Sequence, residues 1–454
     1  MSASESEPTS SRLPLTVALV TVCVLAVTWA WHALAPSLAA TLSFAIAQVV
    51  MISIVIWQAC DPFADAAQWL GERYRIPGSV RGATLDAIAS SMPELFSGIF
   101  FVVVAIAATD GSAAAVSAAG SEGFGATVAT CAGSAVYNMM LIPAICALVI
   151  SVSRKSHPTI DVESKVITRD GMWFLGCELV LIMFLYQAEL QWWMALVLIG
   201  MYCGYVAQLV LDAKSFQRAR DVVQNRLADH SSTDTDSIVR VLREEGIRPS
   251  LSLIEQVRRE RNSESAEDAE EEEDDAAGAL FGLVQIPLTL PKAWIVIGFS
   301  TLVAAAACYW LVEVTREAAA TLNVPIFFLA VIVAAAASSV PDTFLSVGAA
   351  RRGDDDGAVS NAFGSNIFDI CICLAVPLLV NSYLNGWQPV LMTENGQPIA
   401  GLVGLRVLLC GLTLVTLLIM WHGHQLTRRK AFVLIGLYGI FVAYAIAGSL
   451  GFSI

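Results

Sequence analysis

Eleven long apolar segments constrain this chain more than any other feature of its sequence. Each holds about 20 residues with few charges, which is the length that an α-helix needs to cross a bilayer. They lie at 13–34, 39–60, 80–107, 124–152, 171–188, 191–212, 292–312, 324–350, 358–381, 402–421 and 430–450. Only 15% of the 454 residues are charged, against roughly 25% in a soluble domain. The sequence therefore predicts an all-α integral membrane protein.

The basic residues alternate from one connecting loop to the next. Lys and Arg occur in the loops at 61–79, 151–170, 213–291, 351–357 and 422–429, whereas the loops between these hold only Arg316. The positive-inside rule places the basic loops in the cytoplasm. The C-terminus should then face outward, and eleven spans put the N-terminus inside. The plasma membrane is the default location.

The first apolar segment has two interpretations. Ala33-Leu34-Ala35 resembles a signal-peptide cleavage site, but Pro36 would follow the cut, and residues 1–11 are acidic rather than basic. We therefore favour a retained extra helix over a cleaved signal.

Residues 213–291 form the only long hydrophilic stretch. Its segment 260–275 contains ten acids and one base, a net charge of −9. This tract lacks the spaced ligands of a calcium-binding loop, so we interpret it as a solvated tail, with a regulatory calcium sensor as the alternative. The ten cysteines all lie within apolar segments and the five histidines are scattered, which favours packing and interfacial roles over a soft-metal site.

Two parts of the chain resemble each other. The first is Ser90-Ser91-Met92-Pro93-Glu94, followed by Gly133-Ser134-Ala135-Val136-Tyr137-Asn138. The second is Ser338-Ser339-Val340-Pro341-Asp342, followed by Gly364-Ser365-Asn366-Ile367-Phe368-Asp369. Five spans separate the two, so they enter the membrane from opposite sides. Inverted repeats of this kind are typical of secondary transporters with a binding site near the midplane.

The expected fold is two inverted five-helix repeats, ten core transmembrane helices in all, plus an extra N-terminal helix. We expect the N-terminal tail and extra helix at 1–38, the first membrane repeat at 39–212, a cytoplasmic loop at 213–291 and the second membrane repeat at 292–454.

Each repeat places an acid inside an apolar helix, directly after a proline. Proline cannot donate a backbone hydrogen bond, so Pro93 should free carbonyls near Ala89 and Ser90, and Pro341 those near Ala337 and Ser338. Carbonyl, hydroxyl and carboxylate oxygens are the ligands of hard cations such as calcium. The candidate ligands are Ser90, Ser91, Glu94, Ser134, Asn138, Ser338, Ser339, Asp342, Ser365 and Asp369. The alternative is a pair of proline kinks with polar side chains bonded between helices, but ionisable groups within a membrane are functional candidates by default.

The charge of these acids suggests a mechanism. Ionised Glu94 and Asp342 carry −2, and Asp369 would make −3, which one Ca²⁺ or two to three Na⁺ would neutralise. Enclosing uncompensated charge is costly. The binding site should therefore switch its access from one side of the membrane to the other only when cations are bound. This predicts a secondary antiporter and not an enzyme. Its partners would be inorganic cations and the lipid bilayer, with no nucleic acid and no resident cofactor.

At these residues the chain resembles the calcium/cation antiporter superfamily. The second repeat, from Ser339 to Asp369, is most similar to the potassium-dependent sodium/calcium exchangers. The resemblance implies that Glu94 and Asp342 are the central calcium ligands, helped by the carbonyls of Ser90 and Ser338. It implies two flanking sodium sites, one at Ala87, Ser91 and Ser134 and the other at Ala335, Ser339 and Ser365, with Asn138 and Asp369 between them. An acid at the position of Asp369 accompanies potassium transport in one branch of the family, but occurs elsewhere without it.

The chain also departs from the family pattern. Ala-Ser-Ser precedes each Pro-acid step where the family has Gly-Thr-Ser, which should alter packing and sodium affinity. Glu94 and Ser134 are 40 residues apart, whereas Asp342 and Ser365 are 23 apart. The first repeat thus carries a 17-residue insertion on the outer side, and one hypothesis is that it covers the outer vestibule.

Four other functions compete with sodium/calcium exchange. A proton-coupled calcium exchanger would use Asp342 or Asp369 as the proton carrier, and an exchanger of another divalent cation would use the same ligands. An intramembrane aspartyl protease would use Asp342 and Asp369 as a dyad, but Glu94 in the matching repeat favours an ion cage. A cation channel would need a continuous pore. Stoichiometry, flux direction and oligomeric state do not follow from the sequence.

Overall fold

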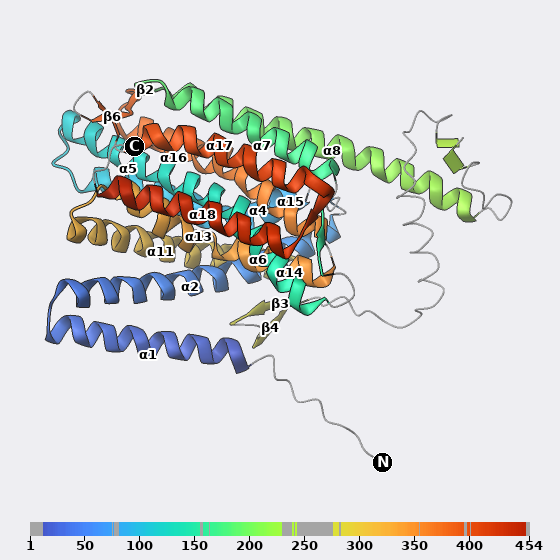
Figure 1. Ribbon diagram of the computed structural model, residues 1–454, viewed down its shortest axis with the longest axis horizontal. Coiled ribbons are helices and arrows are strands. Elements are labelled where there is room, and N and C mark those ends of the chain that lie inside the picture. The colour runs from blue at the N-terminus through green and yellow to red at the C-terminus, as the bar shows by residue number, and fades with distance from the viewer. Residues whose placement is uncertain are drawn as a thin grey trace, which may run out of the picture.

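The computed structural model describes residues 12–74, 76, 81–154, 158–162, 164–228, 238–239, 241–242, 276–280, 283–353, 355–394, 397–399 and 401–450. These residues form a bundle of long, roughly aligned helices with a few very short strands at its ends (Figure 1). The acidic tract at 260–275, interpreted above as a solvated tail, lies outside the described residues.

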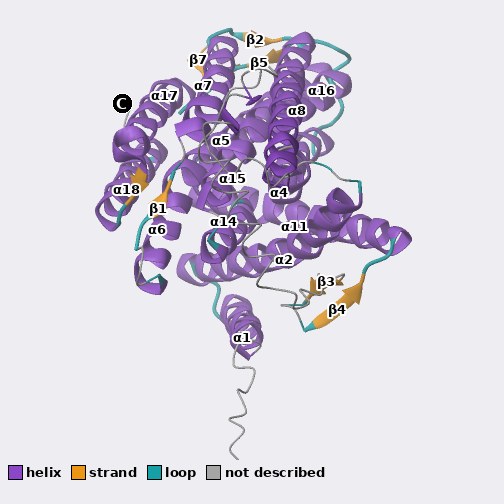
Figure 2. Ribbon diagram, turned by 90° about the vertical axis from the view of Figure 1, so that its right-hand side faces the viewer, coloured by secondary structure: helices purple, strands orange, loops and turns teal. Residues whose placement is uncertain are grey.

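The first half of the bundle contains five core spans and a peripheral helix. Its elements are α1 (Arg12–Leu34), α2 (Leu38–Arg73), the π-helix η1 (Gly82–Asp86), α4 (Ala87–Ala107), α5 (Ala113–Val136), the π-helix η2 (Tyr137–Leu141), α6 (Ile142–Ser153), α7 (Ser164–Leu185) and α8 (Trp192–Ala228). Helix α1 lies at the edge of the bundle, beside α2 (Figure 2). The chain therefore has the predicted extra helix outside its core.

The second half repeats this plan. Its elements are α11 (Leu290–Leu322), α12 (Ile326–Leu329), the π-helix η3 (Ala330–Ala334), α13 (Ala335–Ser338), α14 (Val340–Arg352), α15 (Asp355–Phe368), the π-helix η4 (Asp369–Cys373), α16 (Ala375–Leu384), α17 (Leu402–Trp421), the 3₁₀ turn η5 (His422–His424) and α18 (Arg428–Ser449). Among the described residues, nine helices are long and apolar enough to cross a membrane, or ten if the bent pair ending in α14 counts as one span. The remaining predicted span is α7, which is helical but carries Arg169, Asp170 and Glu178.

Two short strand pairs show the inverted symmetry of the halves. Strand β1 (Ile160–Asp161), which follows the third core span of the first half, pairs with β8 (Gln425–Leu426), which precedes the fifth core span of the second. Strand β5 (Val390–Leu391) follows the third core span of the second half and pairs with β2 (Glu189–Leu190), which precedes the fifth of the first. If the two halves of the chain changed places, the β1–β8 ladder would take the position of the β2–β5 ladder, and the reverse. Because α7 runs from β1 to β2, the ladders lie at opposite ends of the bundle, as an inverted repeat requires.

Two further hairpins are local. Strands β6 (Thr393–Glu394) and β7 (Gln397–Pro398) pair beyond β5. Strands β3 (Ala276–Ala279) and β4 (Val284–Pro287) pair before α11, and β3 packs against α2 (Figure 2). The backbone N–H of Gly278 donates to Asp65 Oδ2 at 2.9 Å, so the end of the hydrophilic insert is fastened to the first core helix.

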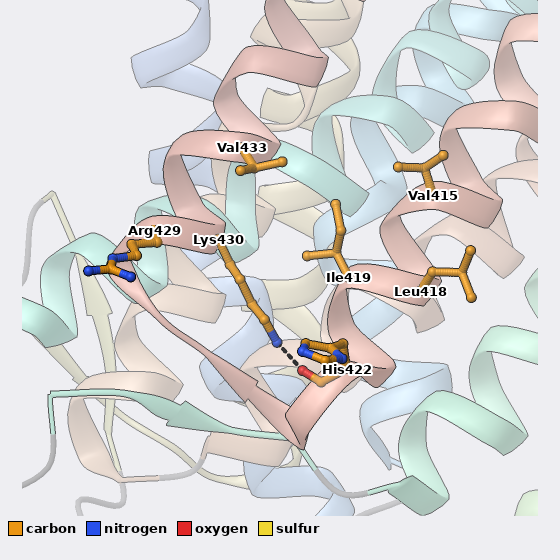
Figure 3. A pocket seen from close by; sticks show the side chains of 7 residues that line it. All are labelled: Val415, Leu418, Ile419, His422, Arg429, Lys430 and Val433. Atoms are coloured by element: carbon orange, nitrogen blue, oxygen red, sulfur yellow. Dashed lines mark hydrogen bonds between the residues drawn. The ribbon is translucent and has the colours of Figure 1, made fainter.

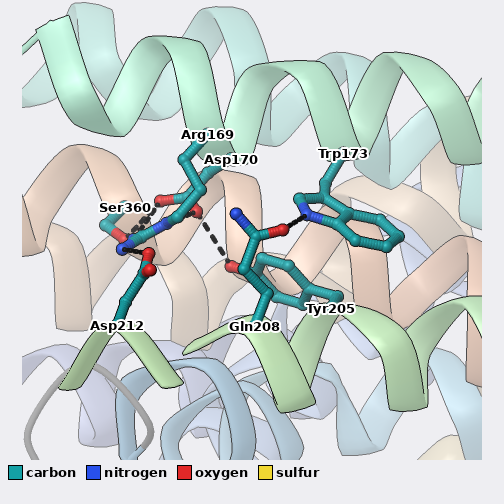
Figure 4. Close-up of polar contacts among 7 residues, drawn as sticks. All are labelled: Arg169, Asp170, Trp173, Tyr205, Gln208, Asp212 and Ser360. Atoms are coloured by element: carbon teal, nitrogen blue, oxygen red, sulfur yellow. Dashed lines mark hydrogen bonds and ion pairs between the residues drawn. The ribbon is translucent and has the colours of Figure 1, made fainter. Parts of the chain in front are cut away.

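The end of the bundle that carries the basic loops is called the basic end below. There the buried carboxylate of Asp170 anchors α7, and Figure 4 shows its polar contacts. Asp170 is fully buried, and its oxygens accept hydrogen bonds from Arg169 at 2.6 and 2.9 Å. Tyr205 of α8 donates to Asp170 at 3.3 Å, and Ser360 of α15 at 3.2 Å. A buried charge persists only when it is paired and hydrogen-bonded. This cluster meets that need while fixing α15, which carries part of the second repeat, against α7 and α8.

The 17-residue insertion lengthens helices rather than a loop. The sequence predicted the third core span from residue 124, but α5 begins at Ala113. Ser112 caps it by accepting a hydrogen bond from Ala115 N, and the alanine-rich turns that follow favour a helix. Helix α5 holds 24 residues and its counterpart α15 holds 14. Helix α4 holds 21 residues, and its counterparts α13 and α14 hold 4 and 13. Helix α2 likewise continues to Arg73, beyond the predicted end at residue 60.

Arg154 should be a main source of stability at the basic end. Its guanidinium donates to both carboxylate oxygens of Asp355 at 3.0 and 2.9 Å, and to the carbonyl of Ala350 at 2.7 Å. One side chain thus joins the ends of α6, α14 and α15, and the carboxylate of Asp355 raises the pKa of Arg154 further.

We expect Arg154→Gln to lower the melting temperature of the purified protein by several degrees, because charge-assisted hydrogen bonds contribute about 1–3 kcal/mol. Arg218→Gln on the exposed surface of α8 is the matched control and should leave the melting temperature unchanged. Equal melting temperatures of the two variants would show that the contacts of Arg154 with Asp355 and Ala350 contribute nothing to stability.

Candidate cation-binding site

Four π-helical turns flank the acids of the two repeats. Turns η1 and η3 begin at Gly82 and Ala330, each twelve residues before the acid of its repeat, Glu94 or Asp342. Turns η2 and η4 follow soon after Ser134 and Ser365. A π turn interrupts the regular hydrogen-bond ladder and frequently marks a functional site. Their matched positions show that the two halves share a local backbone deformation as well as residue types.

The two prolines act differently on the backbone. Helix α4 runs through Pro93 without a break. In the second repeat, α13 ends at Ser338 and α14 begins at Val340, with a bend of 41° between the two parts. Neither proline has an N–H to donate, so the predicted freeing of carbonyls is compatible with both arrangements. A break in the helix occurs beside Pro341 but not at Pro93. A proline in the first turn of a helix is well tolerated, and Pro341 is the second residue of α14.

Close helix packing brings the two repeats together beside Ser134. A Cβ atom on Gly133 would lie 2.1 Å from the carbonyl oxygen of Val331 and 2.6 Å from the Cβ of Ala335. Only glycine therefore allows α5 to approach η3 and α13 this closely. The next residue, Ser134, consequently faces Ser339 across the boundary between the repeats.

One hydrogen-bond network joins the three acids. Ser134 Oγ lies 3.1 Å from Glu94 Oε1 and 3.0 Å from Asp369 Oδ2. Ser339 Oγ lies 3.2 Å from the same Glu94 oxygen and 2.9 Å from Ser134 Oγ. Three of these contacts, from Ser134 to Asp369 and from Ser339 to Glu94 and Ser134, therefore join the first repeat to the second.

The second half of the network surrounds Asp342. Asn138 Nδ2 donates to Asp342 Oδ2 at 3.1 Å and to Ser134 Oγ at 3.4 Å. Ser365 Oγ donates to Asp342 Oδ1 at 2.8 Å and lies 3.0 Å from Ser90 Oγ. Eight of the predicted ligands thus form a single connected cluster with contributions from both repeats.

The cluster is enclosed and rich in unsatisfied oxygen atoms. Glu94, Asp342 and Asp369 are all fully buried, and in the described part of the chain no Lys or Arg pairs with any of them. Three buried oxygens have no hydrogen-bond partner there, namely Glu94 Oε2, Asn138 Oδ1 and Asp369 Oδ1. Leaving buried acceptors unpaired costs about 1–3 kcal/mol each, and more for charged groups. Such oxygens are suited to a hard cation.

The other predicted residues lie at the edge of the cluster. Ser90 Oγ donates to the Ala87 carbonyl at 3.4 Å, and Ser338 Oγ donates to the Ala335 carbonyl at 3.1 Å. The Ser91 hydroxyl is buried without a partner, and its carbonyl accepts from Cys373 Sγ at 3.5 Å. The matching Ser90 and Ser338 bonds again show the symmetry of the repeats.

Sequence reasoning gave no role to Asn366, although it lies within the Gly-Ser-Asn-Ile-Phe-Asp motif. The structure shows it fully buried, with Nδ2 donating to the Ala135 carbonyl at 3.2 Å and Oδ1 unpaired. It therefore joins the paired helices α15 and α5 next to the acids. Its amide within an apolar helix was the signal that could have identified it.

No three His, Cys, Asp or Glu side chains in the described residues are placed to hold a metal ion by themselves. A cation bound among Glu94, Asp342 and Asp369 would therefore also need hydroxyl, amide or carbonyl oxygens. The surrounding serines and Asn138 supply these groups, which are typical ligands of calcium and sodium and unlike those of zinc or copper.

Comparison with known families agrees with this arrangement. The family model described as sodium/calcium exchanger protein matches residues 44–211 and 292–447. The chain belongs to this family. The match covers both halves of the bundle and omits the hydrophilic insert, and it confirms the resemblance to the calcium/cation antiporter superfamily.

Individual relatives refine the placement within the family. Human sodium/potassium/calcium exchanger 5 is 25% identical over 394 residues, which cover 77% of this chain and 72% of that protein. Human sodium/potassium/calcium exchanger 2 is 31% identical over 138 residues, covering 30% of this chain but only 20% of that protein. Similarity to the potassium-dependent branch is therefore confirmed.

A solved structure shares the architecture. The H⁺/Ca²⁺ exchanger CAX superposes with a TM-score of 0.54 at 12% identity, covering 95% of this chain and 93% of that chain. At this identity the likeness concerns the fold alone. It confirms a multi-pass membrane protein with two inverted repeats.

Ser134 should be the most sensitive hydroxyl of the cluster. In Ser134→Ala, Glu94 Oε1 and Asp369 Oδ2 lose a shared donor, so the cation-free protein should lose about 1–3 kcal/mol of stability and melt at a lower temperature. Ser382→Ala is the matched control, because that buried hydroxyl has no partner to lose. The role given to Ser134 is wrong if Ser134→Ala and Ser382→Ala have the same melting temperature.

Proposed function

We propose that this chain is a secondary antiporter that moves Ca²⁺ in one direction and Na⁺ in the other. The observation that carries this proposal is the set of three enclosed acids, which are drawn from both repeats and joined by Ser134, Ser339 and Asn138. Three negative charges without a basic partner suit exchange of a divalent cation for several monovalent ones. Membership of the sodium/calcium exchanger family supports the same reading.

We assign the central calcium ligands to Glu94 and Asp342, with the carbonyls of Ser90 and Ser338. One sodium site would lie at Ala87, Ser91 and Ser134, and the other at Ala335, Ser339 and Ser365. Asn138 and Asp369 would lie between them. The cluster supports this assignment because Ser134 and Ser339 already contact Glu94, and Ser365 already contacts Asp342.

The obligatory nature of exchange follows from electrostatics. A closed site with unneutralised carboxylates in a low-dielectric interior is costly, so the bundle should change its open side only with cations bound. One Ca²⁺ or two to three Na⁺ satisfy the same carboxylates, but not both sets at once. Competition for one set of oxygens therefore couples the two fluxes without any covalent chemistry.

We extend the proposal to the topology. The basic end of the bundle, with the insert 213–291, would face the cytoplasm, and the C-terminus would face outward, in the plasma membrane by default. The domain limits would be those given by the sequence, at 38, 212 and 291. The clustering of Arg154, Arg169 and Arg428 at the same end of the bundle is consistent with the positive-inside rule.

Proton coupling is the second candidate. The comparison structure named above is a H⁺/Ca²⁺ exchanger, and a buried carboxylate can exchange a cation for a proton. The serine set around Glu94 favours sodium, because Na⁺ needs several oxygen ligands whereas a proton needs one. A protease dyad is disfavoured, because Asp342 and Asp369 hydrogen-bond to different partners.

Neutralising Glu94 tests the central ligand. In proteoliposomes loaded with sodium, the intact protein should take up ⁴⁵Ca²⁺ only while the sodium gradient lasts. Glu94→Gln should reduce this uptake at least about tenfold, because removing a charged ligand from a buried cation costs more than ~1.4 kcal/mol.

Glu178→Gln is the matched control for this assay. Glu178 is another fully buried glutamate, but it bonds Thr413 between α7 and α17 and lies outside the cluster. Uptake should persist in this variant. Calcium uptake that is unaffected by Glu94→Gln would show that the site lies elsewhere. Calcium uptake driven by a proton gradient alone would show that the coupling ion is H⁺ and not Na⁺.

A variant of Asp369 tests whether potassium takes part in transport. If Asp369 helps to hold K⁺, calcium uptake by the intact protein should rise when potassium accompanies calcium. In Asp369→Asn the uptake should then be independent of potassium. Equal calcium uptake by the intact protein with and without potassium would show that K⁺ takes no part in transport.

A further inference from the structure

A groove opens between α17 and α18 at the basic end of the bundle, away from the cation site. Its volume is about 410 Å³. The apolar part of its wall is formed by Val415, Leu418 and Ile419 of α17 and Val433 of α18 (Figure 3). Val415, Leu418 and Val433 are 42%, 67% and 52% exposed. Since both helices are apolar spans, these side chains face the hydrocarbon of a bilayer.

Basic groups line the end of the same groove. His422, Arg429 and Lys430 complete its lining, which contains no acid. Figure 3 shows the Lys430 side chain reaching across to the His422 carbonyl, to which its ammonium donates. A second donor of this ammonium binds the Gln425 carbonyl at 2.7 Å. Since an ammonium has three donors, one remains for a ligand, and the charge is held in place at the mouth.

The neighbouring cations are also available. Arg429 is exposed, and it has no hydrogen-bond or ion-pair partner in the described part of the chain. The Arg428 guanidinium lies 5.8 Å from the centre of the Phe432 ring, on the same helix turn. These residues occupy the first turn of α18, where the helix dipole adds positive potential. Arg429 and Lys430 therefore line the polar end of a membrane-facing apolar groove, and Arg428 precedes them in the chain.

We propose that this groove binds an anionic phospholipid, with its phosphate at Arg429 and Lys430 and an acyl chain along Val415, Leu418 and Val433. Basic pockets between transmembrane helices are suited to anionic headgroups. The apolar wall next to the cations requires a ligand that carries both a negative head and a hydrocarbon tail, which inorganic anions and soluble phosphates lack. The ligand belongs to the leaflet at the basic end.

The site is separate from the proposed transport function. Its residues take no part in the acid cluster, and lipid binding can be measured without any cation gradient. Failure of lipid binding would therefore leave the exchanger proposal untouched, and the reverse also holds.

The test compares binding of dioleoyl phosphatidylglycerol and dioleoyl phosphatidylcholine to the purified full-length protein in detergent, by native mass spectrometry. The intact protein should bind its first phosphatidylglycerol more tightly than its first phosphatidylcholine. Arg429→Gln should weaken phosphatidylglycerol binding roughly fivefold, the effect of one surface charge near a lipid headgroup. Lys292→Gln, an exposed cation at the start of α11 at the same end, is the matched control and should bind as the intact protein does.

A second pair of variants tests the acyl wall. Val433→Trp fills the groove and should weaken binding of both lipids, whereas Val407→Trp, on an exposed part of α17 outside the groove lining, should not. Equal affinity of the intact protein for the two lipids would overturn the proposal. The same conclusion would follow if Arg429→Gln and Lys292→Gln bound phosphatidylglycerol alike.

Discussion

Three carboxyl groups enclosed among apolar helices without a basic partner are the constraint on which the rest of this structure depends. Glu94, Asp342 and Asp369 are fully buried, and desolvating a charge costs several kcal/mol unless other groups compensate for it. Hydroxyl and amide donors from both repeats supply part of that compensation. The oxygens that remain unpaired are suited to the cation that we propose binds here. On this proposal, the two halves share one ligand.

The helices are deformed in a way that suits the proposed site. A regular α-helix uses its own carbonyls, so a cation-binding helix needs interruptions. The π turns at matched positions in the two repeats, and the 41° bend between α13 and α14, provide them. Close contact at Gly133 then brings Ser134 to the second repeat. Away from this centre, the ends of the bundle are fastened by Arg154, by Asp170 and by the two symmetry-related strand ladders.

The sequence predicted the features that follow from hydropathy and residue type. In the described residues, each of the eleven predicted segments is helical, and all but α7 are apolar enough to span a membrane if the bent pair counts as one span. The repeated Ser-Ser-X-Pro-acid pattern predicted the acids and most of their partners. It could not give the difference between Pro93 and Pro341, because a proline may either remain within a continuous helix or begin a new one, and tertiary packing decides between them. It also placed the start of α5 eleven residues too late, because residues such as Ser117, Gly120 and Glu122 reduce hydropathy without ending the helix. The bridging role of Ser339 depends on packing between residues 205 positions apart.

The most direct test of a shared site is calcium binding to the purified protein by isothermal titration calorimetry, in sodium-free buffer and again with added sodium. We expect one Ca²⁺ per chain, bound in competition with sodium and lost in both Glu94→Gln and Asp342→Asn, since each repeat would supply one indispensable ligand. Calcium binding that survives neutralisation of either acid would contradict a single site built from both repeats.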